Sequence, residues 1–270
     1  YINPSMAQKL KALNVQFIDA HGNAYINHPP LYIYVTGNKQ TAHRAEREEL
    51  NRAFDATGLK LIFGLLCNPG LLNKTYREIA KQTGIALGAV GKALKGLIDA
   101  GFLIDKGRGK ERRLINKQKL LDRWVETYPE KLKPKLLVGE FLAEDPYWWQ
   151  YIKIEEYGAY WGGEVAAAKY TGHLKPQNTM FYLPEKAGNK LLAKARLRKN
   201  TIYAGVGGAT ENTARVKIYR PFWPEVTERQ GATVNPILVY ADLISTGDSR
   251  NLETARVIHE QYIAEYLREA

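Results

Sequence analysis

Residues 57–116 read TGLKLIFGLLCNPGLLNKTYREIAKQTGIALGAVGKALKGLIDAGFLIDKGRGKERRLIN, and this stretch decides the fold of the central part of the chain. The pattern predicts two helices, a tight turn, a third helix and then two short strands joined by a turn rich in Gly, Lys and Arg. This order of elements is typical of a winged helix-turn-helix, a module that lays one helix into the major groove of DNA.

The first two helices are marked by their periodicity and by their ends. Apolar residues at the i, i+3, i+4 and i+7 spacing predict a helix with one buried stripe. These residues are Leu59, Ile62, Phe63 and Leu66. Thr75 followed by Glu78 is a capping box, in which the hydroxyl and the carboxylate bind two otherwise unpaired amides of the second helix. Gly84 follows that helix, where a residue that tolerates positive φ allows a tight reversal.

The third helix is expected over residues 86–100. Its predicted buried side is Leu87, Val90, Leu94, Leu97 and Ile98. Its other face carries Gly88, Ala89, Gly91, Lys92 and Lys95. Small residues at the helix start let the backbone approach the floor of a groove, and the lysines can reach phosphates. Because no Arg, Asn or Gln stands on that first exposed turn, direct readout of base edges is expected to be modest.

The two strands after the third helix form the predicted wing. Residues 102–104 and 112–115 are the strand candidates, and the two glycines between them suit a hairpin turn. Five basic residues at or beside that turn suit contact with the phosphate backbone. A winged helix that binds only protein, with a solvated charged loop, is the alternative. The predicted DNA-contacting residues are Thr75, Tyr76, Lys81, Ala86, Gly88, Ala89, Lys92, Lys95, Lys106, Arg108, Lys110, Arg112 and Arg113.

The distribution of charge favours a polyanionic partner. Residues 57–135 contain 17 Lys and Arg against 7 Asp and Glu, a net charge of +10, whereas the whole chain carries +11. Nearly all of the excess positive charge is therefore local, as expected for a surface that binds double-stranded DNA. General solubility would not require this concentration.

Composition limits the remaining possibilities. At 270 residues with 45% hydrophobic and 25% charged residues, the chain can form two or three folded units. No apolar run approaches the ~20 residues that span a bilayer, so no membrane association and a cytoplasmic location are expected. The single cysteine, Cys67, is expected to pack in a core. The chain starts at Tyr1 rather than Met, which is compatible with a truncated N-terminus.

The expected fold class is α+β. A winged helix-turn-helix (residues 55–116) would lie between a small N-terminal α/β piece (residues 1–54) and a C-terminal α/β domain (residues 117–270). Near the end of that domain, the apolar residues 237–240 are expected to form a strand, followed by a helix on which Leu252 faces inward. In the N-terminal piece, Asp19 and Lys39 invite a comparison with metal-dependent nucleases, which place acids and a lysine at adjacent strand ends. Gly37 stands where such sites need an acid. The piece is therefore interpreted as degenerate or purely structural.

The C-terminal region offers a second enzymatic interpretation. Gly162-Gly163 before a helix is similar to the start of nucleotidyltransferase sites, but no Asp-x-Asp pair follows. Asp242, Asp248 and Glu253 could be imagined as metal ligands, although their setting fits the start of a helix. The five histidines are scattered without ligand spacing. We therefore expect no catalytic residue, no metal and no cofactor, with a nuclease-like or nucleotidyltransferase-like enzyme as the alternative.

Three runs of sequence carry a family resemblance. They are GLKLIFGLLCNPGLLNKTYREIAKQTGIALGAVGKALKGLIDAGFL (residues 58–103), WGGEVAAAKYTGHLKPQNTMFYL (161–183) and NPILVYADLISTGDSRNLETARVIHEQYI (235–263). The chain resembles the AbiEi-type antitoxins of type IV toxin-antitoxin systems. In this chain, unlike the simplest antitoxin layout, an α/β piece precedes the winged helix.

The resemblance implies a bacterial DNA-binding transcriptional regulator that represses its own operon. It also implies a C-terminal domain that counters a nucleotidyltransferase toxin, as a functional link in which direct contact is left open. The residues it covers are the recognition helix, Ala86 to Lys95, and the wing, Lys106 to Arg113. Two copies on operator repeats would supply specificity, so a homodimer is a further expectation. A third hypothesis is a protein-interaction module with Trp148, Trp149, Trp161 and Trp223 as exposed anchors, although aromatic residues at this density are more often part of a core.

Overall fold

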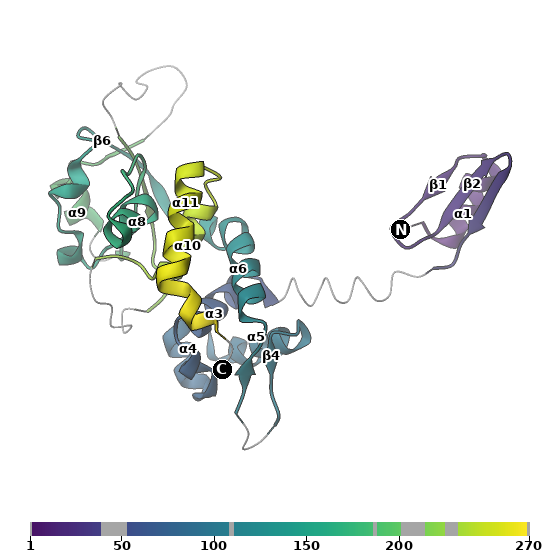
Figure 1. Ribbon diagram of the computed structural model, residues 1–270, viewed down its shortest axis with the longest axis horizontal. Coiled ribbons are helices and arrows are strands. Elements are labelled where there is room, and N and C mark those ends of the chain that lie inside the picture. The colour runs from purple at the N-terminus through teal and green to yellow at the C-terminus, as the bar shows by residue number, and fades with distance from the viewer. Residues whose placement is uncertain are drawn as a thin grey trace. The chain divides into compact units, whose positions relative to one another are not determined.

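The computed structural model describes residues 2–38, 53–107, 111–185, 188–200, 214–224 and 232–268 (Figure 1). Contacts group the chain into two compact units, Tyr1–Asn51 and Arg52–Ala270. Both units mix helices and strands, as expected for the α+β class. The further division of the second unit at residue 116 stays a prediction.

In residues 2–38, the described part of the first unit, a helix accompanies a small antiparallel sheet of order β1-β2-β3. Its elements are α1 (Pro4–Ala12), β1 (Phe17–Ile18), β2 (Ala24–His28) and β3 (Leu31–Val35). The Asn3 side chain caps α1 by accepting from the Met6 amide, and Pro4 occupies the first helical turn. The Tyr25 hydroxyl donates to Asn14 Oδ1 at 2.9 Å, which ties the sheet to the chain after the helix.

The second unit begins with three helices and a hairpin, which we call the helix–hairpin module. Its elements are α3 (Ala56–Cys67), the 3-10 turn η1 (Pro69–Asn73), α4 (Tyr76–Thr83), α5 (Leu87–Asp99), β4 (Leu103–Ile104) and β5 (Arg113–Leu114). The predicted stripe on α3 is buried throughout. Cys67, at the end of α3, is half-buried.

Two predictions for the buried side of α5 are wrong. Leu87 is 47% exposed and Ile98 is 39% exposed. The buried stripe instead consists of Val90, Ala93, Leu94, Gly96 and Leu97. Gly96 belongs to it because a Cβ there would lie 3.3 Å from the Ala53 backbone, so a small residue lets the chain before α3 pack closely.

The remaining elements form a five-stranded sheet with helices. Two helices, α6 (Lys117–Lys131) and α7 (Lys133–Leu136), lead into the first strand of the sheet, β6 (Leu137–Ala143). The elements that follow along the chain are η2 (Trp148–Gln150), η3 (Ile154–Tyr157), β7 (Tyr160–Gly162), α8 (Gly163–Thr171), β8 (Thr179–Tyr182), α9 (Gly188–Lys194), β9 (Arg198–Lys199) and β10 (Ala214–Tyr219). The chain then continues through α10 (Pro236–Ile244), α11 (Ser249–Ile258), the π-helical turn η5 (His259–Ile263) and α12 (Ala264–Leu267). The strand order is β7-β8-β10-β6-β9, with β8 and β10 parallel and the other pairs antiparallel.

The structure corrects two predictions in this region and decides between two interpretations of the tryptophans. Residues 237–240, expected to be a strand, lie in α10, because the Asn235 side chain caps the helix through the Ile237 amide and Pro236 starts its first turn. Leu252 on α11 is 40% exposed rather than inward. Trp148, Trp161 and Trp223 are buried, and Trp149 is half-buried, so the first three are not exposed anchors.

Aromatic packing joins the helix–hairpin module to the sheet region. Trp124 of α6 stacks on Phe63 of α3 at 5.5 Å between ring centroids and on Tyr128 at 4.8 Å. Phe63 also meets Phe222 at 5.0 Å. α10 packs against both α6 and α8 (Figure 1). The second unit is therefore held together by one continuous core.

None of the helices in the described ranges is both long and apolar enough to cross a membrane.

Candidate nucleic-acid interface

The turn between α4 and α5 is built as the sequence predicts. Thr75 and Glu78 form the capping box: the Thr75 amide donates to Glu78 Oε2 at 3.0 Å, and the Glu78 amide donates to Thr75 Oγ1 at 3.3 Å. The hydrogen bond from the Thr75 side chain lowers the pKa of Glu78. Gly84 ends α4 with φ of 66°, and a Cβ there would lie 2.9 Å from the Phe222 carbonyl oxygen. Glycine is thus required both by conformation and by space.

The face of α4 and α5 that bears the predicted contacts is open to solvent. Most of those contacts are exposed: Thr75, Tyr76, Lys81, Ala86, Gly88, Lys92 and Lys95. Ala89 is half-buried. A Cβ added at Gly88 would meet no atom within 4 Å, so the start of α5 has free space around its backbone. A flat partner surface could approach this turn closely.

The hairpin pairs Leu103 with Leu114 and Ile104 with Arg113. Leu103 and Leu114 are buried, whereas Lys106 and Arg113 are exposed. Gly107 adopts a φ of 88°, and its amide donates to Asp105 Oδ1 at 2.9 Å, which starts the turn. Arg108 and Lys110, two of the predicted contacts, lie outside the described residues.

Arg112 connects the hairpin to the segment before α4. Its main-chain amide donates to Asn73 Oδ1 at 2.8 Å, and Asn73 Nδ2 donates back to the Arg112 carbonyl at 3.1 Å. Its side-chain Nη2 donates to the Lys74 carbonyl at 3.2 Å. The guanidinium carbon lies 5.5 Å from the centre of the Tyr76 ring. These contacts hold the hairpin against the start of α4, so half-buried Arg112 has a structural role in addition to its predicted contact with DNA.

Tyr76 lies where the three elements of the interface meet. It begins α4, it lies beneath the Arg112 guanidinium, and a Cβ at Gly91 of α5 would be 3.4 Å from its ring. The sequence alone did not indicate the role of Asn73. Its two bonds to Arg112 span 39 residues, and no local pattern reports a contact of that range.

The acids considered for catalysis have structural partners. Partial desolvation raises the pKa of Asp19, but hydrogen bonds from Ile2, Asn23 and His21 more than offset it and hold that pKa well below its usual value. Asp248 caps α11 by accepting from the Asn251 amide at 3.1 Å. Within the described ranges, no group of three or more His, Cys, Asp or Glu side chains could hold a metal ion.

The two glycines before α8 serve packing. A Cβ at Gly162 would lie 2.9 Å from the Tyr182 ring, and one at Gly163 would lie 2.8 Å from the Met180 side chain. The Gly163 amide also donates to the buried carboxylate of Asp242. Close approach of α8 to β8 thus accounts for the two glycines.

Comparison with known proteins gives two family matches. Residues 113–264 match the family model described as transcriptional regulator, AbiEi antitoxin, type IV toxin-antitoxin system. Residues 59–122, which cover most of the helix–hairpin module, are similar to the Firmicute plasmid replication protein RepL. No curated protein and no solved structure matches the chain. The first match spans more than half of the 270 residues and includes the sheet, α8, α10 and α11. The chain belongs to the AbiEi antitoxin family, a family of transcriptional regulators from type IV toxin-antitoxin systems.

Proposed function

We propose that the helix–hairpin module is a winged helix-turn-helix and that the protein is a DNA-binding transcriptional regulator, an antitoxin that represses its own operon. The observation that carries this proposal is the joint placement of α4, α5 and the hairpin around Tyr76, with exposed lysines on the helices and the hairpin fastened by Arg112. The +10 charge of residues 57–135 supports a polyanionic partner.

In this proposal α5 enters the major groove by its first turn. The small residues Ala86, Gly88 and Ala89 let the backbone come close, while Lys92 and Lys95 bind phosphates. Lys81 adds a phosphate contact from α4, and the wing adds Lys106, Arg108, Lys110 and Arg113. Thr75 and Tyr76 contact the sugar-phosphate backbone of the DNA beside the groove. Affinity then rests mainly on phosphates and falls steeply with salt.

The first exposed turn of α5 has no side chain that could form a bidentate hydrogen bond to a base edge, so sequence specificity must come from other sources. The candidates are the wing, the sequence-dependent shape of the DNA and the pairing of two copies on operator repeats. A homodimer on DNA is therefore part of the proposal. The link to a nucleotidyltransferase toxin is functional, the protein itself is not an enzyme, and its place of action is the cytoplasm.

Binding to the DNA upstream of the gene tests the proposal. Fluorescence anisotropy with that DNA and with a scrambled duplex, at several salt concentrations, should show tighter binding to the upstream DNA at each concentration. Lys92→Ala with Lys95→Ala should weaken binding and reduce the slope of log K against log[salt] by about 2, because two phosphate contacts are lost. Lys190→Ala with Lys194→Ala, which removes two exposed charges from α9, is the matched control and should leave the slope unchanged.

Equal affinity for both duplexes at all salt concentrations would contradict a sequence-specific regulator. A loss in the α9 control equal to that in the α5 variant would show that only net charge matters.

A second candidate function is a role in plasmid replication. The similarity of residues 59–122 to the RepL family model favours it, because that match lies on the module proposed to bind DNA. Competition between operator DNA and plasmid origin DNA distinguishes the two candidates, since a replication protein should prefer the origin.

A further inference from the structure

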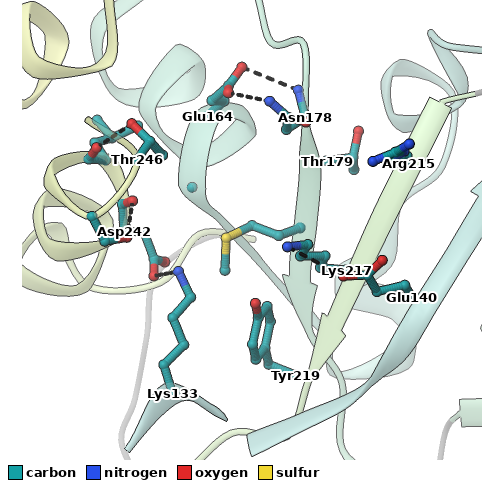
Figure 2. Close-up of a pocket in the computed structure, with 14 residues that line it drawn as sticks. Lys133, Glu140, Glu164, Asn178, Thr179, Arg215, Lys217, Tyr219, Asp242 and Thr246 are labelled. Atoms are coloured by element: carbon teal, nitrogen blue, oxygen red, sulfur yellow. Dashed lines mark hydrogen bonds and ion pairs between the residues drawn. The ribbon is translucent and has the colours of Figure 1, made fainter. Parts of the chain in front are cut away.

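A pocket of about 370 Å³ lies between the sheet and the helices of the second unit (Figure 2), and none of its lining residues belongs to the helix–hairpin module. Its volume is within the range of small-molecule sites. One wall is β10, on which Arg215, Lys217 and Tyr219 share a face because side chains alternate along a strand. The other walls come from α7, α8, β8 and α10, with Lys133, Met180 and Asp242 among the lining residues.

Three acidic residues line the pocket: Glu140, which pairs with Lys217, and Asp242 and Glu164, which already have donors. Asp242, whose side chain is 1% exposed, holds Lys133 Nζ at 2.8 Å through Oδ1, and its Oδ2 accepts from the Tyr182 hydroxyl at 3.5 Å. Burial raises the pKa of Asp242, and Lys133 lowers it. Glu164 accepts from the Gln177 amide at 2.6 Å and from Asn178 Nδ2 at 3.0 Å. Neither carboxylate therefore requires a cationic ligand.

The basic groups, in contrast, retain unused donors. In the described part of the chain, the exposed side chain of Arg215 has neither a hydrogen bond nor an ion pair within the protein. Lys217 has a single ion pair, to Glu140 at 3.4 Å, and half of its side chain is exposed. The Lys133 ammonium group has three N–H donors and pairs with one carboxylate, that of Asp242. The unused hydrogen-bond donors of the pocket thus belong to cationic side chains, which favour an anionic ligand.

Figure 2 shows the amino groups of Lys133 and Lys217 on two sides of the space, with Arg215 beside Thr179 at its edge. Donors that come from different directions suit a tetrahedral phosphate, because a carboxylate accepts hydrogen bonds mainly in one plane. The Tyr219 ring and the Met180 side chain supply an apolar surface next to these cations. An uncharged part of a ligand could lie against it.

We propose that this pocket binds a small phosphate-bearing metabolite, with the phosphate between Lys133, Lys217 and Arg215 and the rest of the molecule against Tyr219 and Met180. The inference goes beyond DNA binding and does not depend on it. Two sources share this chemistry: an inorganic phosphate or pyrophosphate, and a phosphate ester such as a nucleoside monophosphate.

Isothermal titration of the full chain at constant ionic strength distinguishes the sources. The probes are orthophosphate, pyrophosphate, AMP, adenosine and succinate. Saturable binding of AMP with none of adenosine would assign a phosphate ester, and binding of pyrophosphate alone would assign an inorganic ion. Arg215→Gln and Lys217→Gln should each weaken binding about tenfold, because each removes a charge-assisted hydrogen bond. Lys199→Gln, an equal change of charge on exposed β9, should stay within about twofold of the wild type.

The proposal is overturned if none of the phosphate probes binds, if succinate binds as tightly, or if the Lys199 variant loses as much affinity as the pocket variants. It is also overturned if only duplex DNA binds there. Thermal unfolding without ligand checks that the variants fold, and Arg215→Lys, which keeps the charge, should lose less than Arg215→Gln. DNA affinity measured on the same samples keeps failure of this proposal separate from failure of the regulatory one.

Discussion

The indole N–H of Trp124 donates a hydrogen bond of 2.8 Å to the carbonyl oxygen of Leu59, 65 residues earlier in the chain. Both residues are fully buried. This bond joins α6, which leads into the sheet, to the first helix of the module. Trp124→Phe keeps an aromatic ring but leaves no donor, so we expect the free energy of unfolding to fall by about 1–3 kcal/mol. Urea unfolding measures it. Glu126→Ala on exposed α6 surface is the control, and equal losses in both variants would contradict the importance of this bond.

Gly84 and Gly88 should respond oppositely to alanine. At Gly84 a Cβ is opposed by the positive φ and by the Phe222 carbonyl at 2.9 Å, so Gly84→Ala should cost about 1–3 kcal/mol. Gly88 lies inside α5 with open space around it, so Gly88→Ala should stabilise by up to about 1 kcal/mol. Thermal unfolding compares them. A stabilised Gly88→Ala variant with weaker DNA binding would support close approach of the backbone to the groove.

The capping box predicts a small, local effect at the start of α4. Thr75→Ala removes the hydroxyl that accepts from the Glu78 amide, and it should lower the free energy of unfolding by about 1 kcal/mol. Thr75→Ser keeps the hydroxyl and should restore most of this stability. If serine were as destabilising as alanine in urea unfolding, the lost methyl group rather than the cap would explain the effect.

Arg112 should matter through its shape more than through its charge. Arg112→Lys preserves the charge but loses the planar group that lies on Tyr76 and reaches the Lys74 carbonyl. We expect DNA affinity to fall roughly tenfold, as for one lost charged hydrogen bond, with little change in salt slope. Arg77→Lys on α4 is the matched control. Arg112→Gln removes the charge as well, and a salt slope reduced by about 1 in that variant would indicate a direct phosphate contact.

The buried pair of Lys133 and Asp242 predicts a dependence on pH. Burial raises the pKa of Asp242, so this group favours the folded state only below its unfolded pKa, and stability declines as pH rises through its folded pKa. Lys133→Met removes the cation that opposes the shift. The free energy of unfolding of this variant should fall more steeply from about pH 4 upward and be lower by roughly 3 kcal/mol at neutral pH.

Adding Asp242→Asn to Lys133→Met removes the titrating group and should abolish this pH dependence. Urea unfolding of both variants across the pH range provides the measurement. A Lys133→Met protein as stable as the wild type at neutral pH would mean that Asp242 needs no cation.

The sequence by itself determined the elements whose causes are local. The stripe on α3, the capping box of Thr75 and the turn at Gly84 depend on residues within one or two helical turns, and the structure has all three where the pattern puts them. The family motifs likewise identify the antitoxin family, whose model covers residues 113–264. Local prediction failed at residues 237–240, where an apolar run suits a strand or a buried helix equally, and the Asn-Pro cap decided for the helix.

Only the tertiary structure decided what depends on residues far apart in the chain. Three of the four tryptophans that could have been exposed anchors are buried because the sheet and helices close over them, and Arg112 fastens the hairpin through a residue 39 positions away. The pocket, in the same way, combines Lys133 of α7, Lys217 of β10 and Asp242 of α10. The physical reason is that sequence periodicity reports which face of an element is apolar, whereas the partner of that face, and the polar groups left without one, are settled only when the elements pack.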